Sequence, residues 1–321
     1  MSNRGYQLGY ACINMTLSEK GITTNRGMIK STMIKKGARG VGELFLKNVE
    51  DLEKVIKWNV DNDIYLYRLS SSLWPWMSEF EFEELPQAEQ ISKKLKEIGD
   101  FYQTFKHARL TFHPGHFTLL GSPNEEINQR GIIDLNKHAE IMDLLGLPRS
   151  YKAPINIHLG GSYDSKENTY RRFAKNWEKL SEGARSRLVV ENDDKASQYS
   201  VNDLLNLHRL IGIPITFDYH HHRFSGGIHS EYEAINNAYI TWPSDIVPIV
   251  HYSSCRKSFE DPSCKAQAHA DWIYEKINDY GLALDIELES KAKELALLKY
   301  RKDLNEHYNH RQVLLESYKV I

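Results

Sequence analysis

The chain has 321 residues, 41% of them hydrophobic, and a formal net charge of −2 that neither indicates nor excludes a nucleic-acid partner. No run approaches the ~20 apolar residues that cross a membrane, and the first residues enter a strand pattern without a signal-peptide apolar region. The cysteines Cys12, Cys255 and Cys264 lack CxxC spacing, which argues against a disulfide framework or a cysteine zinc site, so we expect a cytoplasmic protein with no membrane partner.

Eight short apolar runs are typical of β-strands, and helical patterns separate them. The strand-like runs are Tyr6–Asn14, Ile64–Ser71, Ala108–His113, Pro154–Gly160, Arg187–Asp193, Pro214–His220, Val247–Ser253 and Leu282–Glu289. The helical patterns lie near Gly42–Asn62, Pro86–Lys106, Glu125–Leu145, Asn168–Glu182, Val201–Leu210, His229–Ala238, Ala268–Tyr280 and Lys291–Leu304. Strict alternation implies a parallel sheet, and eight repeats imply its closure. We predict a single α/β TIM (β/α)8 barrel over residues 1–304 and a polar helical tail at 305–321, although two ordinary domains would also fit this length.

Local signals mark the ends of several helices. The segment Ser200-Val-Asn-Asp203 has the form of a capping box, in which two side chains satisfy backbone donors of the first turn. Pro86 suits a first helical position. Gly183 and Gly212 stand where a helix is expected to end in a left-handed residue.

The ends of six strands carry the densest metal-ligand chemistry of the chain. They read Thr111-Phe-His113, Asn156-Ile-His158, Val190-Glu191, Asp218 with His220 to His222, Val250-His251, and Asp285 to Glu289. A single histidine at the end of a buried strand is more simply a hydrogen-bonded core residue. This simpler explanation does not suit six strand ends together, because a closed barrel brings them to one rim. Ionisable groups gathered there are costly unless they are paired or bind an ion. The set therefore predicts a metal site.

The ligand types narrow the choice of ion. Imidazoles and carboxylates without thiolates suit Zn²⁺, Mn²⁺ or Fe²⁺ better than Ca²⁺ or Mg²⁺. The candidates are His113, His158, Glu191, Asp218, His221, His251, His269 and Glu289. They are too many for one tetrahedral ion and fit two or three divalent ions, with Mn²⁺ expected first, Zn²⁺ or Co²⁺ as alternatives, and no organic cofactor. Such a cluster suits hydrolysis of a phosphate ester.

Several longer strings occur in a characteristic order along nearly the whole chain, from about Tyr6 to Tyr300. The strings are GYACIN, YRLSS with Pro75, FHPGHF, NIHLGG, VVENDD, FDYHHH, VHYSS, HADWI and ELESKAKELALL. Together they resemble the UV damage endonucleases, although any one string alone would be weak. The wider relatives of that family are the xylose-isomerase-like barrels, which include apurinic-site endonucleases.

This resemblance implies a metal-dependent endodeoxyribonuclease for DNA repair. Such an enzyme nicks damaged double-stranded DNA immediately 5′ of a UV-induced lesion and leaves a 3′-hydroxyl and a 5′-phosphate. We expect a monomer that associates with the nucleoid through DNA. The family's ligands fall on the eight candidates above, and the residues expected to carry catalysis are Glu191, Glu289 and His251.

Within the ligand set, the resemblance also implies particular roles. Glu191 and Glu289 resemble bridging carboxylates, and His221 and His269 resemble ligands of an outlying ion. Glu287 competes with Glu289 for the ligand position on the last strand. The K-x-K-E segment that follows fixes the register on Glu289.

Other residues match positions that contact DNA in the family. Tyr10 and Asn14 match a first-strand pair associated with the flipped lesion. His116 and Phe117 fall where the family has Gln and an aromatic residue inserted opposite the lesion, and the simpler alternative for Phe117 is a loop aromatic that covers the barrel mouth. The basic residues expected to neutralise DNA phosphates are Arg68, Arg256 and Lys257, each of which could instead be a solvated surface residue.

Three positions depart from the family pattern. His116 replaces the usual Gln, Ile249 stands where some members carry a lysine, and Ser72 stands where some carry a histidine. These departures put the range of lesions and the preferred metal in doubt. Two rival functions fit parts of the sequence: a sugar isomerase or epimerase on the same metal-binding barrel, and a DNA-damage sensor without catalytic activity.

Overall fold

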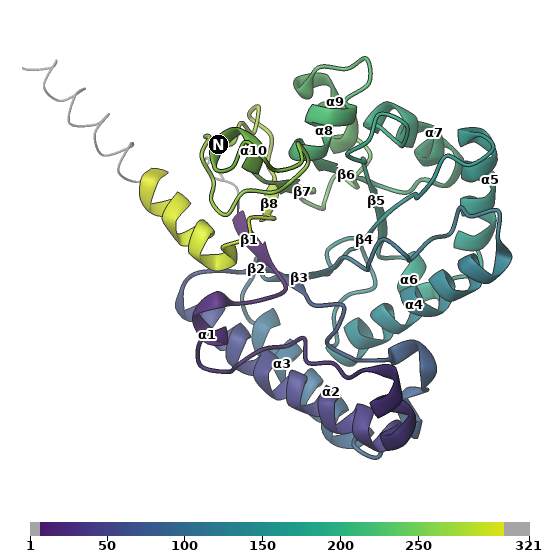
Figure 1. Cartoon of the computed structure of the whole chain (residues 1–321), viewed down its shortest axis with the longest axis vertical. Coiled ribbons are helices and arrows are strands. Elements are labelled where there is room, and N and C mark those ends of the chain that lie inside the picture. Colours follow the sequence, from purple (N-terminus) through teal and green to yellow (C-terminus); the bar gives the residue numbers. More distant parts are fainter. Residues whose placement is uncertain (1–6, 305–321) are drawn as a thin grey trace, which may run out of the picture.

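The computed structural model, which describes residues 7–304, is a closed barrel of eight parallel strands (Figure 1). The strands are β1 (Gln7–Ala11), β2 (Leu66–Leu69), β3 (Arg109–Phe112), β4 (Ile155–His158), β5 (Leu188–Glu191), β6 (Ile215–Asp218), β7 (Ile249–Tyr252) and β8 (Asp285–Leu288). Each strand pairs with the next, and β8 pairs in parallel with β1. The predicted TIM barrel is confirmed, whereas the predicted tail at 305–321 lies outside the described residues.

Helices surround the strands and cover the outer face of the barrel (Figure 1). The longer helices are α2 (Lys30–Asp61), α3 (Ala88–Gln103), α4 (Glu125–Leu144), α5 (Lys166–Trp177), α7 (Val201–Ile211) and α9 (Glu231–Tyr239). The shorter ones are α1 (Met15–Ser18), α6 (Glu182–Arg185), α8 (Tyr219–Ser225), α10 (Arg256–Phe259) and the 3-10 helices η1 (Met77–Glu79) and η2 (Phe82–Glu84). Residues 293–304 are also helical. No helix within residues 7–304 has both the length and the apolar composition needed to span a membrane.

The longest helix shows why these segments pack on the sheet. Val41, Phe45, Val49 and Leu52 of α2 are fully buried. Their spacing of three or four residues places them on one face of the helix, and that apolar face covers the strands. α2 begins at Lys30, well before the predicted start at Gly42, and it continues across a break in helical geometry at Gly37, where φ is 57°.

One predicted helix is wrong. The segment Ala268–Tyr280 is irregular, because its backbone is hydrogen-bonded to the loop after β7 rather than to itself. Ala268 O accepts from Arg256 N at 2.8 Å, and Ala270 N donates to Ser254 O at 2.9 Å. The amide of Tyr274 donates to the Ser254 hydroxyl at 3.0 Å. These contacts hold the segment across the end of the barrel and carry His269 with it.

The predicted helix ends had mixed outcomes. The capping box at Ser200 and the left-handed end at Gly212, with φ of 71°, are confirmed in α7. Gly183 lies inside the short helix α6 instead of ending a longer one. Pro86 precedes Gln87, which is the N-cap of α3, so it is not the first helical residue.

The inward-facing residues of the strands alternate along the chain, as the two-residue period of a strand requires. Contacts between strands that are not neighbours identify this inner face. Arg109 Nη1 of β3 lies 2.7 Å from Asp285 Oδ2 of β8, and the Thr111 hydroxyl donates to Glu287. The interior therefore contains charged and polar groups, which must be compensated because little water reaches them.

Candidate metal centre

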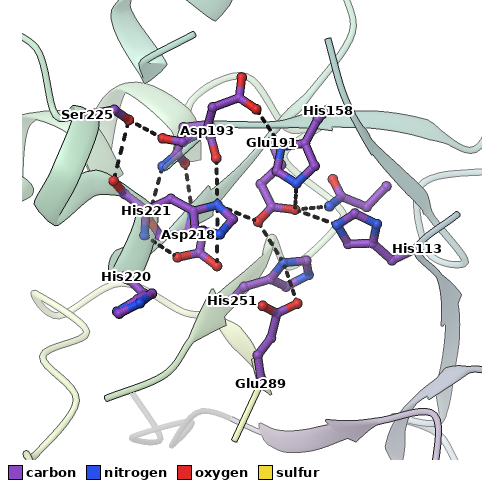
Figure 2. A network of polar contacts seen from close by, with 12 residues as sticks. His113, His158, Glu191, Asp193, Asp218, His220, His221, Ser225, His251 and Glu289 are labelled. Carbon is purple, nitrogen blue, oxygen red and sulfur yellow. Dashed lines mark hydrogen bonds and ion pairs between the residues drawn. The ribbon is translucent and has the colours of Figure 1, made fainter. Parts of the chain in front are cut away.

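Eight side chains from strand ends and the loops after them converge at the carboxyl-terminal mouth of the barrel, and Figure 2 labels seven of them. Their ligand atoms form four groups, and the atoms within each group all lie within 4.8 Å of one another. The groups are His113, His158 and Glu191; His113, His251 and Glu289; His221, His269 and Glu289; and Glu191, Asp218 and His251. The structure thus brings together all eight residues that the sequence predicts as ligands.

Glu191, the last residue of β5, lies at the centre of this cluster (Figure 2). Its Oε2 is 3.0 Å from His113 Nε2, and its Oε1 is 3.3 Å from His221 Nδ1 and 3.2 Å from His251 Nδ1. Burial raises the pKa of this carboxyl, but the charges of His251 and His158 outweigh burial and hold the pKa well below its ordinary value. The buried carboxyl is therefore an anion that faces several imidazoles.

Glu289, which follows β8, is a second centre. Its Oε1 lies 2.6 Å from Arg68 Nη1 and 3.6 Å from His251 Nδ1, while its Oε2 lies 3.8 Å from His269 Nδ1. Burial raises the pKa of Glu289, but Arg68 and His251 hold it well below its ordinary value. Glu287 belongs to none of the four groups and contacts the opposite nitrogen of His251. The geometry favours Glu289 over Glu287 as the ligand.

Asp218, the last residue of β6, has one oxygen that accepts a hydrogen bond and one that accepts none. Its Oδ1 accepts from the backbone amide of His221 at 2.7 Å. This contact caps the first turn of α8. Its Oδ2 and the Nδ1 of His269 are buried and have no hydrogen-bond partner among residues 7–304. Burial raises the pKa of Asp218 to about 7, and the negative charges of Glu191 and Glu289 add to the rise. A bound cation would satisfy these atoms, whose burial without a partner is costly.

The donor set as a whole fits divalent cations. Three carboxylates supply oxygen ligands, five imidazoles supply nitrogen ligands, and no cysteine belongs to any of the four groups in the described part of the chain. This mixture suits Mn²⁺ or Zn²⁺. Without an ion the imidazoles compensate the acids: burial lowers the pKa of His221, but Asp218 and Glu191 raise it to about 11.

The sequence prediction does not include several polar residues that hold the ligands. The Asn156 amide donates to Glu191, and Asp193 Oδ1 lies 3.1 Å from His158 Nδ1. Glu287 lies behind His251, as described above. Strand periodicity indicates such a supporting role for Asn156 and for Glu287, which the sequence presents only as a competing ligand, because each precedes a candidate ligand by two residues and so shares its face of the strand. Asp193 follows β5, where that periodicity no longer applies.

Tyr10 and Asn14, predicted to contact a flipped lesion, lie in the core. Gly9 faces the barrel interior, where a Cβ atom would be 2.4 Å from Leu66 Cγ, so the next residue, Tyr10, faces the helices. The Tyr10 hydroxyl donates to Asn59 Oδ1 at 2.7 Å and accepts from Asn14 Nδ2 at 2.9 Å. Tyr10 is 0% and Asn14 2% exposed. The predicted lesion contact is therefore corrected: this pair joins β1 to α2.

The position of Arg68 also corrects a prediction. Arg68 lies inside the barrel, and its Nη1 is 2.6 Å from Glu289 Oε1 and 3.6 Å from Glu287 Oε2. Its side chain is 9% exposed, so it is not placed on the rim to neutralise DNA phosphates. Its charge instead compensates the two carboxylates.

The remaining predicted DNA contacts lie in the segments that follow β3 and β7, at the same end of the barrel as the ligands. Phe117, in the loop after β3, is 79% exposed, and its ring centroid is 3.9 Å from that of the exposed His116. An aromatic ring so open to solvent has little packing role in the isolated chain. Lys257 of α10 is exposed, and the partly exposed Arg256 has acidic neighbours at 3.6 and 3.8 Å.

Two departures from the family pattern are visible in the fold. Ile249 is 2% exposed and packs with Leu66, Val189 and Trp242 in a small apolar cluster. A role that needs a lysine at this position therefore has no basis here. Ser72 is exposed and belongs to none of the four ligand groups.

Comparison with known proteins identifies the family. The model of the family described as "UV-endonuclease UvdE" matches residues 6–317. The chain belongs to this UV-endonuclease family. Membership supports a DNA-repair endonuclease as the class of enzyme, in agreement with the resemblance carried by the sequence strings.

Curated members of the UV-endonuclease family align with most of this chain. The UV-damage endonuclease of Schizosaccharomyces pombe is 33% identical over 301 residues, covering 91% of this chain and 49% of that protein. The putative UV-damage endonuclease of Acanthamoeba polyphaga mimivirus is 32% identical, covering 93% of this chain and 91% of that protein. The UV DNA damage endonuclease of Clostridium perfringens is 30% identical, covering 98% of this chain and 76% of that protein. The chain thus spans about half the length of the yeast relative and most of the other two.

Solved structures confirm the family architecture. The crystal structure of SacUVDE is similar with a TM-score of 0.80 and 30% identity, covering 95% of this chain and 99% of that one. Endonuclease IV of Thermus thermophilus has a TM-score of 0.57 at 14% identity, covering 94% and 99%. A D-psicose 3-epimerase of Clostridium cellulolyticum has a TM-score of 0.52 at 12% identity, covering 75% and 79%. At such low identity, the last two show a shared fold alone.

Proposed function

We propose that this protein is a DNA-repair endonuclease that incises the backbone of duplex DNA immediately 5′ of UV-induced lesions and leaves a 3′-hydroxyl and a 5′-phosphate. The observation that carries the proposal is the convergence of eight imidazoles and carboxylates at the mouth of a UV-endonuclease barrel. This is the end at which TIM-barrel enzymes carry their active sites. Phosphodiester hydrolysis is chemistry that such a ligand set can support.

The eight residues would hold two or three divalent ions, with Mn²⁺ the first candidate and Zn²⁺ or Co²⁺ the alternatives. When bound, such ions supply a water of lowered pKa and positive charge for the phosphate oxygens. Glu191 and Glu289 each belong to two of the four groups, which supports a bridging role for both carboxylates. His251 and His113 also belong to two groups each, so the three residues proposed for catalysis, together with His113, link the separate parts of the cluster.

The chain's own groups orient these ligands. Arg68 Nη1 holds Glu289 Oε1 at 2.6 Å, which leaves Oε2 on the side of His269. The backbone amide of His221 donates to Asp218 Oδ1 and leaves Oδ2, which accepts no hydrogen bond, within the cluster. Because these groups are fixed before substrate arrives, the ligands need little rearrangement during the reaction.

Phe117 and His116 are proposed to engage the damaged duplex. An exposed aromatic ring can fill the space that extruded bases leave in the stack, and damaged base pairs cost less to open. Selectivity would then follow from the weakness of the damaged pair rather than from reading a sequence. Arg256 and Lys257 would neutralise backbone phosphates, which would make binding depend on salt.

A nicking assay tests the proposed function. The purified chain with Mn²⁺ is incubated with UV-irradiated, abasic and undamaged duplexes of one sequence. We expect incision of the irradiated duplex, mapped to the bond 5′ of the lesion. Polymerase extension of the upstream strand checks the 3′-hydroxyl, and ligation after photoreversal of the dimer, which leaves the terminal nucleotide in place, checks the 5′-phosphate.

Two results would overturn the assignment. One is equal cleavage of irradiated and undamaged duplex, and the other is lesion binding without incision at any Mn²⁺ concentration. The second result would support the damage-sensor alternative. The epimerase alternative rests on a shared fold alone and receives no separate support from the site.

A further inference from the structure

Two buried carboxylates lie behind candidate metal ligands instead of among them. Asp193 and Glu287 are 4% and 1% exposed, and neither belongs to any of the four ligand groups. Each is close to one nitrogen of an imidazole whose other nitrogen faces Glu191. His158 lies in front of Asp193, and His251 lies in front of Glu287. This shared arrangement gives both carboxylates a task that the ligand assignment does not explain.

Asp193 lies on the Nδ1 side of His158, at ion-pair distance. Its Oδ1 is 3.1 Å from His158 Nδ1, while His158 Nε2 is 3.9 Å from Glu191 Oε2 (Figure 2). The position of Asp193 is itself fixed, because its Oδ2 accepts from the Tyr199 amide at 3.2 Å and its carbonyl accepts from the Ser225 hydroxyl. The carboxylate therefore has a fixed position relative to the imidazole.

Glu287 lies at ion-pair distance from the other nitrogen of His251, Nε2. Its Oε2 is 3.2 Å from His251 Nε2, while His251 Nδ1 is 3.2 Å from Glu191 Oε1. Glu287 also accepts a hydrogen bond from the Thr111 hydroxyl, and Arg68 Nη1 lies 3.6 Å from it. These neighbours fix the carboxylate on the inner face of β8.

We propose that Asp193 and Glu287 are positioning residues that select opposite tautomers of His158 and His251. The negative charge of each carboxylate favours a proton on the imidazole nitrogen beside it, although neither contact has the geometry of a hydrogen bond in the described structure. The lone pair is then left on Nε2 of His158 and on Nδ1 of His251, the two nitrogens on the side of Glu191. The inference rests on the proposed metal site, in which these nitrogens bind the cations.

The substitutions Asp193→Asn and Glu287→Gln test this proposal with little change of shape. An amide can turn its NH₂ group toward the imidazole and place the proton on the nitrogen that should bind the metal. We expect Mn²⁺ to bind each variant about 10–100-fold more weakly than the unchanged protein, the usual effect of losing such a supporting contact. Free Mn²⁺ is measured by electron paramagnetic resonance during titration, without DNA.

A matched control is available on the same strand. Asp285 of β8 is also a buried carboxylate, but it pairs with Arg109 at the far end of the barrel. Asp285→Asn should lower the melting temperature of the metal-free protein and leave the Mn²⁺ dissociation constant unchanged.

The tautomers can be observed directly by NMR. In the Zn²⁺-loaded protein, the ¹⁵N shifts of labelled histidines should show an Nδ1 proton on His158 and an Nε2 proton on His251. Asp193→Asn should change the first signal, and Glu287→Gln the second.

The outcomes separate this inference from the proposed function. Weaker Mn²⁺ binding in both carboxylate variants, together with the opposite tautomers, supports the positioning role. Unchanged Mn²⁺ affinity in folded Asp193→Asn and Glu287→Gln, or equal weakening by Asp285→Asn, overturns it. If the unchanged protein incises damaged DNA in either case, the proposed function stands. A protein that binds no Mn²⁺ and incises no DNA would overturn both proposals.

Discussion

Buried charges are compensated differently at the two ends of the barrel. At the amino-terminal end, Arg109 Nη1 lies 2.7 Å from Asp285 and donates to the Val247 carbonyl at 2.6 Å. Its other nitrogens donate to the carbonyls of Lys152 and Tyr151, each at 2.9 Å. At the carboxyl-terminal end, three carboxylates and five imidazoles crowd together, and some of their atoms have no hydrogen-bond partner in the described structure. One end is neutralised by the chain itself, and the other is suited to neutralisation by added cations.

The contrast shows that burial of charge alone does not identify a site. The same strands supply both ends, since β3 carries Arg109 and leads to His113, and β8 carries Asp285 and leads to Glu289. The amino-terminal end also has a hollow of about 340 Å³, partly lined by Arg109 and Asp285. Its buried guanidinium is nevertheless paired, so the hollow lacks the unsatisfied donors that distinguish the other mouth.

The strongest test of this contrast is Glu191→Gln. The amide keeps the shape of the side chain but removes the negative charge that faces four imidazoles. We expect kcat for incision to fall by ~10³-fold or more, or about 4 kcal/mol, because metal-supplied charge stabilisation is worth several kcal/mol. Single-turnover nicking of irradiated duplex measures the loss. Normal activity would show that Glu191 is not the bridging carboxylate.

Asp285→Asn should have the opposite profile. Breaking a buried ion pair by removing one partner costs about 3–5 kcal/mol, because the other charge is left uncompensated. We therefore expect a large loss of unfolding free energy in urea and, below the unfolding transition, nearly unchanged incision. A variant that folds well but cannot cut DNA would mean that the two ends are not independent.

Metal addition should stabilise the protein through the carboxyl-terminal mouth alone. A cation that binds only the folded state adds about 2.7 kcal/mol when its concentration is 100 times the dissociation constant. Mn²⁺ should therefore raise the melting temperature of the chelator-treated protein, and of Asp285→Asn by a similar free energy. Glu191→Gln should respond much less. An equal response in Glu191→Gln would place the stabilising ion elsewhere.

The ligand set could be predicted from the sequence because the barrel fold alone brings the strand ends together. Parallel strands in a closed barrel all end at one mouth, so residues far apart in sequence, such as His113 and Glu289, had to meet there. The tautomer-selecting contacts could not be read in this way. They depend on which nitrogen of each ring turns toward Asp193 or Glu287, and that is decided by side-chain packing.

The errors have an equally specific origin. The first strand is apolar on both faces, so its sequence does not reveal that Tyr10 faces the helices and Gly9 the interior. The prediction for Arg68 is wrong because its partner Glu289 directly follows the last strand, and only barrel closure brings the two together. The segment Ala268–Tyr280 has a helical pattern, but its backbone bonds to a distant loop. In each case tertiary contacts overrode a local signal.

The smallest expected effect concerns the rim rather than the charged interior. Phe117→Ala should weaken binding to lesion-containing duplex by about 1–3 kcal/mol, the usual scale for base stacking on an aromatic side chain. Because Phe117 is 79% exposed, the melting temperature and the Mn²⁺ affinity should not change. Ile228→Ala is the matched control, since Ile228 is 86% exposed and is an aliphatic side chain that cannot stack on a base. Fluorescence anisotropy with catalytically inactive Glu191→Gln as background measures the affinity, and equal losses in both variants would assign Phe117 to general apolar contact instead of insertion into the stack.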